Sequence, residues 1–287
     1  MPPLTNSRKL APLIAVALGV ILAPFGQLSA QAPTPNPTPA VEPISWEQLS
    51  EGFEQSHFQI RSNPLLSSSA VAVRASLKRF TPRVIRAAEY GWKKATVKAL
   101  CRASGATACI NSNFFDEQSK PLGTVISRGI QHNRPHNGGG VLTGVFYVTA
   151  DTVGITHRSS FSAERVIEAA QAGPRLISEG APVVGVKDSS TTTSVSLICL
   201  DNEQRIVLMK VALAIFSGSL KEIQGTLLRP ELNCREALNL DGGGSSQLYL
   251  SVSLSAHPGA TREEDLPGRD EVPVALGLFE TSKATAP

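Results

Sequence analysis

Hydrophobic and polar residues alternate along several short segments of this chain. A period of two residues is typical of strands that bury one face, and it occurs in "HFQIRSN" and "AVAVRASL". Two longer segments are interrupted by polar turn residues: "GVFYVTADTVGITH", with Asp151 near its middle, and "SVSLICLDNEQRIVLMKVA", with residues 201–204 between its halves. We therefore predict two β-hairpins there. Further strands are predicted at "ATACINSNFF", "QAGPRLISEG", "ALNL", "QLYLSVSL" and "VPVALGLF".

Three other segments have the pattern of short helices. "TVKALCRASG" places its apolar residues on one helical face and ends at Gly105, a common C-terminal stop. "SGSLKEIQGTLL" has Ser219 and Glu222 at the spacing of a capping box, and "SAERVIEAAQAG" offers Ser162 as an N-cap. Because strands and helices mix without a regular β-α-β alternation, we predict an α+β, or mixed α/β, fold. It would be a single domain around a largely antiparallel or mixed sheet with short helices.

The N-terminal segment has the pattern of a secretory signal peptide. Positive "SRKL" precedes the apolar run "LAPLIAVALGVILAPF", and the small residues of "LSAQA" follow it. We predict a signal peptide at residues 1–30, a proline-rich linker at 31–43, a folded domain at 44–280 and a disordered tail at 281–287. The protein is then exported, to the periplasm or the cell exterior. The alternative is an uncleaved N-terminus that anchors it to the membrane.

Charge and cysteine content narrow the classes of partner. The chain has 27 basic and 24 acidic residues, and subtracting Arg8 and Lys9 of the N-terminal segment leaves 25 basic residues. This balance gives no electrostatic signature for nucleic acid. In an oxidising compartment the four cysteines allow three disulfide pairings. We favour Cys101–Cys109, which flank a helix-to-strand turn, together with Cys199–Cys234; four buried free thiols are the alternative.

A glycine-rich segment between two apolar strands, "ALNLDGGGSSQLYL", is the strongest chemical signal. Glycines let backbone N–H groups face a ligand without an intervening Cβ, and consecutive N–H groups form anion-binding nests. The segment is not a nucleotide-binding P-loop, because no lysine follows the glycines. The alternative is a loose hairpin with an Asx-turn. The candidate residues are Asp241, Gly242, Gly243, Gly244, Ser245 and Ser246.

Three further segments add candidate residues. In "INSNFFDEQSKPLG", the amides of Asn111 and Asn113 suit sugar hydroxyls and Asp116 could act as base or nucleophile, although such residues are also common turn formers. Arg128 in "SRGIQHNRPHNGGG" could grip phosphate, and Arg269 precedes the last strand. Motifs of serine hydrolases, zinc proteases and dinucleotide enzymes are absent from the sequence. Cysteine and aspartate spacing matches no metal motif, so we predict no metal and no cofactor.

Taken in order, these segments resemble the phosphodiester glycosidase family. The shared elements are "INSNFFD", the Pro-Leu-Gly turn at 121–123, "QAGPRLISEG", the full match "NLDGGGSS" and Arg269 before the last strand. The resemblance covers residues 71–279 and implies hydrolysis of a sugar-1-phosphodiester. It implies Asp241 as the carboxylate that activates water or stabilises the transition state, the glycines and serines as the phosphate or sugar cradle, and Asn111, Asn113 and Asp116 on the sugar side.

One departure from the family pattern concerns the substrate. Family members carry an Arg-Thr pair before the strand "SVSLICL", and this chain has three threonines there, at residues 191–193. Either Arg128 or Arg134 replaces that arginine, or the substrate differs. The leading hypothesis is an exported hydrolase acting on sugar-1-phosphodiester linkages in a glycan or cell-envelope polymer. The alternatives are a non-catalytic glycan- or sugar-phosphate-binding domain and a structural envelope protein. We expect no nucleic-acid partner, and membrane contact only through the N-terminal segment.

Overall fold

The computed structural model describes residues 42–61, 67–187, 194–213 and 218–281. The predicted signal peptide, most of the proline-rich linker, the tail beyond residue 281 and the threonines at 191–193 lie outside these residues. What the sequence predicts for them therefore stays a prediction. Among the helices that the structure does describe, none is long and apolar enough to cross a membrane.

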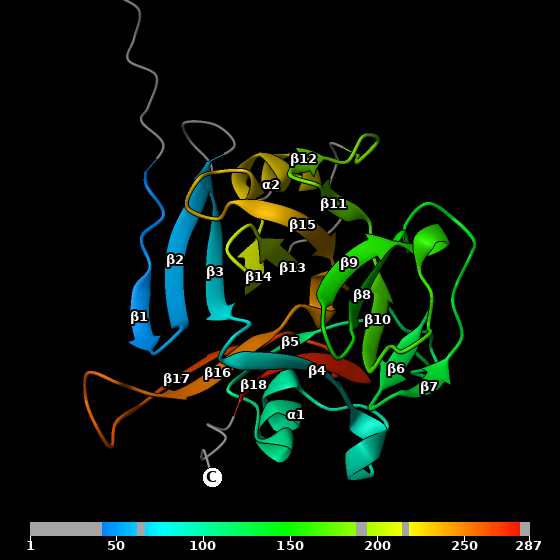
Figure 1. Ribbon diagram of the computed structural model, residues 1–287, viewed down its shortest axis with the longest axis horizontal. Coiled ribbons are helices and arrows are strands. Elements are labelled where there is room, and N and C mark those ends of the chain that lie inside the picture. The colour runs from blue at the N-terminus through cyan, green and yellow to red at the C-terminus, as the bar shows by residue number, and fades with distance from the viewer. Residues whose placement is uncertain (1–41, 62–66, 188–193, 214–217, 282–287) are drawn as a thin grey trace, which may run out of the picture. The chain divides into compact units, whose positions relative to one another are not determined.

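The largest sheet has eight strands among the described residues, and every neighbouring pair in it is antiparallel (Figure 1). The strand order is β1-β2-β3-β14-β13-β15-β11-β12. The bounds are Glu47–Ser50 (β1), Phe53–Arg61 (β2), Ser67–Ser76 (β3), Arg175–Ser178 (β11), Ala181–Pro182 (β12), Ser194–Asp201 (β13), Arg205–Ala212 (β14) and Cys234–Asn239 (β15). The predicted hairpin around residues 201–204 is confirmed as β13 and β14.

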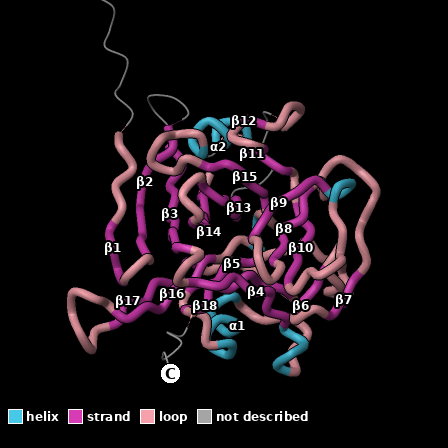
Figure 2. Tube along the Cα trace, in the orientation of Figure 1, coloured by secondary structure: helices cyan, strands magenta, loops and turns pink. Residues whose placement is uncertain are grey.

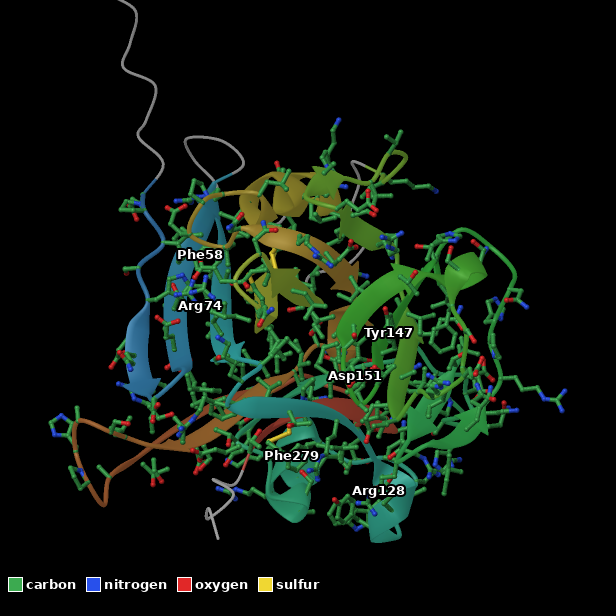
Figure 3. The ribbon with its side chains drawn as sticks, in the orientation of Figure 1. Phe58, Arg74, Arg128, Tyr147, Asp151 and Phe279 are labelled. Atoms are coloured by element: carbon green, nitrogen blue, oxygen red, sulfur yellow. A yellow bond between two sulfur atoms is a disulfide. The ribbon has the colours of Figure 1, made fainter. Side chains whose placement is uncertain are left out.

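Two five-stranded antiparallel sheets make up the rest of the described strands. In the second sheet the order is β7-β6-β10-β8-β9, with bounds Val125–Ser127 (β6), Ile130–Asn133 (β7), Gly144–Val148 (β8), Val153–His157 (β9) and Glu168–Ala172 (β10). In the third it is β17-β16-β5-β18-β4, with bounds Phe80–Arg86 (β4), Ala108–Asn111 (β5), Leu248–Ser253 (β16), Thr261–Leu266 (β17) and Val274–Glu280 (β18). The β8–β9 hairpin is confirmed, with Asp151 at its turn (Figure 3).

The predicted α+β class is wrong, because the described chain is a β-rich fold of antiparallel sheets. Its two α-helices, α1 (Val97–Ser104) and α2 (Leu220–Leu227), have eight residues each, and Figure 2 shows how little of the trace is helical. Both were predicted, with their Gly105 C-cap and capping box. The third predicted helix is instead a turn followed by β10, whose five residues are all buried. Pairing with β6 and β8 on either side outweighs the helical preference of "EAAQA" there.

The main hydrophobic core draws on all three sheets. Phe53 and Ile198 of the first sheet pack in one cluster with Phe146 of the second and with Ile110 and Leu276 of the third. Each helix covers a sheet through a separate cluster: α2 packs on the first sheet and α1 on the third. The three sheets therefore form one unit, in which residues distant in sequence meet at the ends of the strands.

The two favoured disulfide pairings are confirmed. The Cys101–Cys109 disulfide joins α1 to β5, and the Cys199–Cys234 disulfide joins the neighbouring strands β13 and β15. Yellow bonds mark them in Figure 3. Both disulfides lie in the interior, since each of their cysteines is at most 2% exposed.

Candidate active site

The glycine loop, residues 240–247, carries the chain from one sheet into another. It follows β15 of the first sheet and precedes β16 of the third. The backbone N–H of Leu240 donates to Ser196 O in β13 (2.8 Å), and that of Asp241 donates to Ser112 O just after β5 (3.0 Å). Backbone hydrogen bonds from both sheets therefore fix the position of Asp241.

Asn111, at the end of β5, holds both ends of the glycine loop. Its Nδ2 donates to Asp241 O (2.7 Å), and its Oδ1 accepts from Gln247 N (3.0 Å) and from Ser196 Oγ (2.6 Å). The residue is completely buried. The amide of Asn111 thus forms hydrogen bonds with three groups of the protein, and through them it positions Asp241.

The carboxyl group of Asp241 lies in a partly buried position on this loop. Burial raises the pKa of Asp241 from its ordinary value of 3.8 to about 6. Hydrogen bonds from the Ser245 hydroxyl and the Gly242 N–H (2.9 Å to Oδ1) oppose the shift, and the negative charge of Asp270 adds to it. A carboxyl with this pKa can exchange a proton near neutral pH, which suits a general acid or base.

Gly244 makes room for another part of the protein. A Cβ at this position would lie 2.0 Å from Oδ2 of Asp270. Gly244 O also accepts from the backbone N–H groups of Arg269 (2.8 Å) and Asp270 (3.0 Å). A Cβ on Gly268 would in turn lie 2.4 Å from Gly244 O. The third glycine of the motif is therefore required by the packing of residues 266–270, which we call the strap, against the loop.

Two long side chains fix the strap on the glycine loop. Lys210 Nζ donates to the carbonyl oxygens of Leu266 (3.2 Å) and Pro267 (2.8 Å). Gln247 Nε2 donates to Asp270 O (2.7 Å). The side chain of Arg269 is exposed and forms no ion pair with any residue that the structure describes. Arg269 therefore lies beside the loop, with its backbone N–H bonded to Gly244 O.

Two residues predicted for the sugar side have roles in the framework. Asn113 is buried and its Nδ2 donates to Thr124 O (3.1 Å) and Gln171 O (2.9 Å). Asp116 closes a turn, since its Oδ1 accepts from Lys120 N (2.8 Å). Among the hydrogen bonds of the described residues, neither side chain reaches Asp241. Of the predicted polar side chains, Asn111, Ser245 and Asp241 are brought together.

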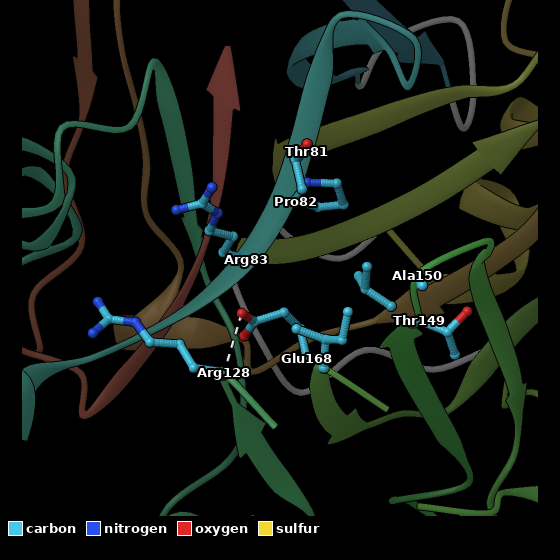
Figure 4. A pocket seen from close by; sticks show the side chains of 9 residues that line it. Thr81, Pro82, Arg83, Arg128, Thr149, Ala150 and Glu168 are labelled. Carbon is cyan, nitrogen blue, oxygen red and sulfur yellow. Dashed lines mark hydrogen bonds between the residues drawn. The ribbon is translucent and has the colours of Figure 1, made fainter. Parts of the chain in front are cut away.

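Arg128 and two histidines of the same sequence segment, His132 and His136, form none of the described hydrogen bonds to the glycine loop. The Arg128 side chain is 74% exposed and pairs with Glu89 (3.4 Å), beside a cavity that also contains Arg83 and Glu168 (Figures 3 and 4). His132 Nε2 lies 2.9 Å from Arg86 Nη1, and burial lowers its pKa. His136 is held through its backbone.

Gln171 is a structural residue to which the sequence analysis gave no role. Its Oε1 accepts from Thr124 N (3.0 Å) and His136 N (2.9 Å), and its Nε2 donates to His136 O (2.7 Å) and Leu142 O (3.0 Å). A Cβ on Gly123 would lie 2.6 Å from Gln171 Oε1. The Pro-Leu-Gly turn therefore packs on the glutamine of "QAGP". Asp270, Gln247 and Ser196 were missed as well, since no local pattern marks them.

Comparison with solved structures identifies the fold. The catalytic domain of zebrafish N-acetylglucosamine-1-phosphodiester alpha-N-acetylglucosaminidase, auto-inhibited by its pro-peptide, matches with a TM-score of 0.60 and 16% identity, over 81% of this chain and 85% of that one. A hypothetical protein from Synechocystis matches with a TM-score of 0.55 and 17% identity, over 84% of this chain and 64% of that one. No curated protein sequence matches significantly.

A comparison of the sequence with protein-family models shows the family to which the chain belongs. The model of the phosphodiester glycosidase family matches residues 104–279, more than half of the chain, and the chain belongs to this family. The resemblance drawn from the sequence motifs is therefore confirmed. Among the described residues, no three His, Cys, Asp or Glu side chains are grouped to hold a metal ion. That no metal is needed stays a prediction.

Proposed function

We propose that this protein is an exported hydrolase that cleaves sugar-1-phosphodiester linkages in a glycan or cell-envelope polymer. The observation that carries the proposal is the carboxyl of Asp241, fixed at the sheet junction with a pKa raised by burial to about 6. Membership of the phosphodiester glycosidase family supports the reaction class. The two buried disulfides support export, because disulfides persist in oxidising compartments.

The chemistry needs only one well-placed carboxylate. Water attacks the anomeric carbon, the bond from that carbon to the phosphate oxygen breaks, and a phosphate monoester leaves with the bonding electron pair. Such a monoester has a second pKa of roughly 6, so it departs with little help from a proton donor. An ordinary glycoside needs a second carboxyl group for that purpose. In this scheme the carboxylate of Asp241 takes the proton from the attacking water.

The glycine loop supplies donors for the anionic part of the substrate. The backbone N–H groups of Gly243 and Gly244 donate no hydrogen bond within the described residues, whereas that of Gly242 is used by Asp241. Free N–H groups in succession suit a phosphate oxygen. Arg269 beside the loop adds a positive charge, and the Ser246 hydroxyl is buried without a hydrogen-bond partner in the described structure. Asn111 and Asn113 act here by holding the loop and its neighbouring segment.

The test is release of free sugar from a panel of α- and β-linked sugar-1-phosphodiesters. We expect turnover by the wild-type protein and a loss of about 10²–10⁴-fold in Asp241→Asn, the range typical of a general base. Asp116→Asn is the matched control, because it changes a carboxylate in a turn. Release that survives in Asp241→Asn but disappears in Asp116→Asn would move the catalytic role to Asp116. Binding of sugar phosphates without any release would identify a glycan-binding domain instead.

A further inference from the structure

An open groove separates strand β4 from the turn between β8 and β9. Two cavities of about 510 and 550 Å³ form it. They are continuous, because both are lined by Thr81 and Pro82 on one wall and by residues 148–150 on the other. Figure 4 shows the first cavity, with Arg83 and Arg128 near Glu168. We call the whole the β4–β8 groove.

The strand register separates this groove from the glycine loop. Pro82 pairs with Leu278 of β18, which pairs with Ala108 at the start of β5. Asn111, which holds the glycine loop, is at the other end of β5. Three residues of strand correspond to about 10 Å. The groove therefore begins at the opposite end of these strands and shares no lining residue with the loop.

The two buried acids of the groove are already used by the protein. Glu168, 3% exposed, accepts hydrogen bonds from Val84 N (3.0 Å) and Arg128 N (3.3 Å). Asp201, 5% exposed, accepts from the side chain of Arg205 (2.6 Å) and from two backbone N–H groups. Their oxygens are thus engaged and turned away from solvent. Asp151 is the exposed acid that lines the groove.

The cations of the groove are exposed. Lys78 and Arg235 line one cavity, and Arg83 and Arg128 line the other. Lys78, Arg83 and Arg235 form no ion pair within the described part of the chain, and the Arg83 guanidinium lies over the Phe279 ring at 4.8 Å. Arg128 pairs with Glu89 (3.4 Å), which does not line these two cavities. The charged residues that line the groove are five basic ones, Lys78, Arg83, Arg128, Arg205 and Arg235, and three acidic ones, Asp151, Glu168 and Asp201. This excess of basic residues gives the groove a positive potential, in a protein whose charges otherwise nearly balance.

We propose that the β4–β8 groove binds an extended, phosphate-bearing stretch of a glycan polymer. Its cations lie toward both ends and suit successive phosphates, while Ala150 and Ile167, which is 40% exposed, offer apolar surface beside them. No exposed aromatic ring lines the described groove, which is unlike a site that stacks nucleic-acid bases. That this ligand is the polymer cleaved at Asp241 rests on the proposed function. The existence of the groove and its positive charge are independent of that function.

The experiment measures binding without turnover. The probe is unsubstituted poly(glycerol phosphate), which has no sugar-1-phosphodiester for the Asp241 site, and the protein carries Asp241→Asn. The groove variant combines Lys78→Gln, Arg83→Gln and Arg235→Gln. The control variant makes the same change in charge at exposed positions outside the groove, with Lys93→Gln, Arg165→Gln and Lys187→Gln. Thermal unfolding of each variant confirms that it is folded.

We expect the parent protein to bind the polymer with an affinity that falls as salt is added, because exposed charges are screened. The groove variant should bind at least about tenfold more weakly, and the control variant should bind as the parent does. An equal loss of affinity in both variants would show a general charge attraction and overturn the proposal that the polymer binds in the groove. No binding by the parent would overturn it too, as would duplex DNA competing equally at the same phosphate concentration. Sugar release is measured separately, so failure of the hydrolase proposal is distinguishable.

Discussion

Replacing Asp241 by asparagine should stabilise the protein at high pH while it removes activity. The pKa of Asp241 is raised from 3.8 to about 6, so the folded state binds this proton more tightly than the unfolded chain does. Each pKa unit corresponds to roughly 1.4 kcal/mol. Two units set an upper limit near 3 kcal/mol, and because the carboxyl is partly exposed, solvent screening reduces the expected effect to about 2 kcal/mol.

The sign follows from the protonation of the two states. Between pH 4 and pH 6 the folded protein keeps a proton on Asp241 that the unfolded chain has lost, so the free energy of unfolding falls as the pH rises. Above pH 6 the full cost of the buried charge is present. Asparagine is neutral throughout, and its Oδ1 can still accept from the Gly242 N–H. The advantage of Asp241→Asn should therefore be small at pH 4 and reach about 2 kcal/mol at pH 8.

The assay is urea unfolding from pH 4 to pH 8 with both disulfides intact, on wild type, Asp241→Asn and Asp151→Asn. The last variant removes one exposed carboxylate at the β8–β9 turn and measures the general effect of that charge. A stability difference for Asp241→Asn that does not change with pH would refute the assignment of a buried, high-pKa carboxyl. A variant less stable than wild type at pH 8 would refute it as well.

Three other predictions concern the loop, the disulfides and the pH profile. Gly244→Ala should displace the strap, lower the free energy of unfolding by about 1–3 kcal/mol and reduce activity. The control is Gly225→Ala in α2, where a Cβ has open space and should raise the free energy of unfolding by about 1 kcal/mol. Urea unfolding of both variants tests this difference. Replacing both cysteines of the Cys199–Cys234 disulfide by serine should lower the free energy of unfolding by about 4 kcal/mol, because this disulfide closes a loop with a sequence separation of 35. The same change at Cys101–Cys109, with a separation of 8, should lower it by about 2.5 kcal/mol. Equal losses in thermal unfolding would contradict the dependence on loop length. The kcat/KM of sugar release should rise with pH through an apparent pKa near 6 and then level off, and Asp270→Asn, which removes the neighbouring negative charge, should move that pKa downward; an unchanged profile would exclude this coupling.

The sequence predicted those elements whose signals are local. Two-residue periodicity with polar turns identified the hairpins, and caps at Gly105 and Ser219 identified both helices. It missed β4, which contains Pro82, and β17, which reads "TREEDL" and alternates between exposed and half-buried positions at a sheet edge. It assigned β10 to a helix, because a short buried run of small residues has no periodicity that separates the two states. Pairing with strands distant in sequence decided β4 and β10, whereas β17 is held by a hairpin with the preceding strand β16.

The candidate site, too, has a part that could be predicted from the sequence and a part that could not. The glycine loop could be found because its glycines are consecutive in sequence. Asn111 was predicted as a ligand of the sugar, and its part in holding the loop could not be predicted. Ser196 and Asp270 of the strap were missed, since these residues come from distant parts of the chain and meet the loop only when the sheets assemble. Arg128 was chosen for its chemistry in a loop, and the structure places it at the β4–β8 groove.

The contact between Gly244 and Asp270 links two positions that are far apart in sequence. Because the carboxylate occupies the space that a Cβ at 244 would need, each position limits what the other can become. A relative with alanine at the third glycine should carry a small or absent side chain at the position equivalent to 270, and the double variant Gly244→Ala/Asp270→Gly should tolerate the alanine better than the single one. Among diverging relatives, the glycine motif and the strap should therefore change together.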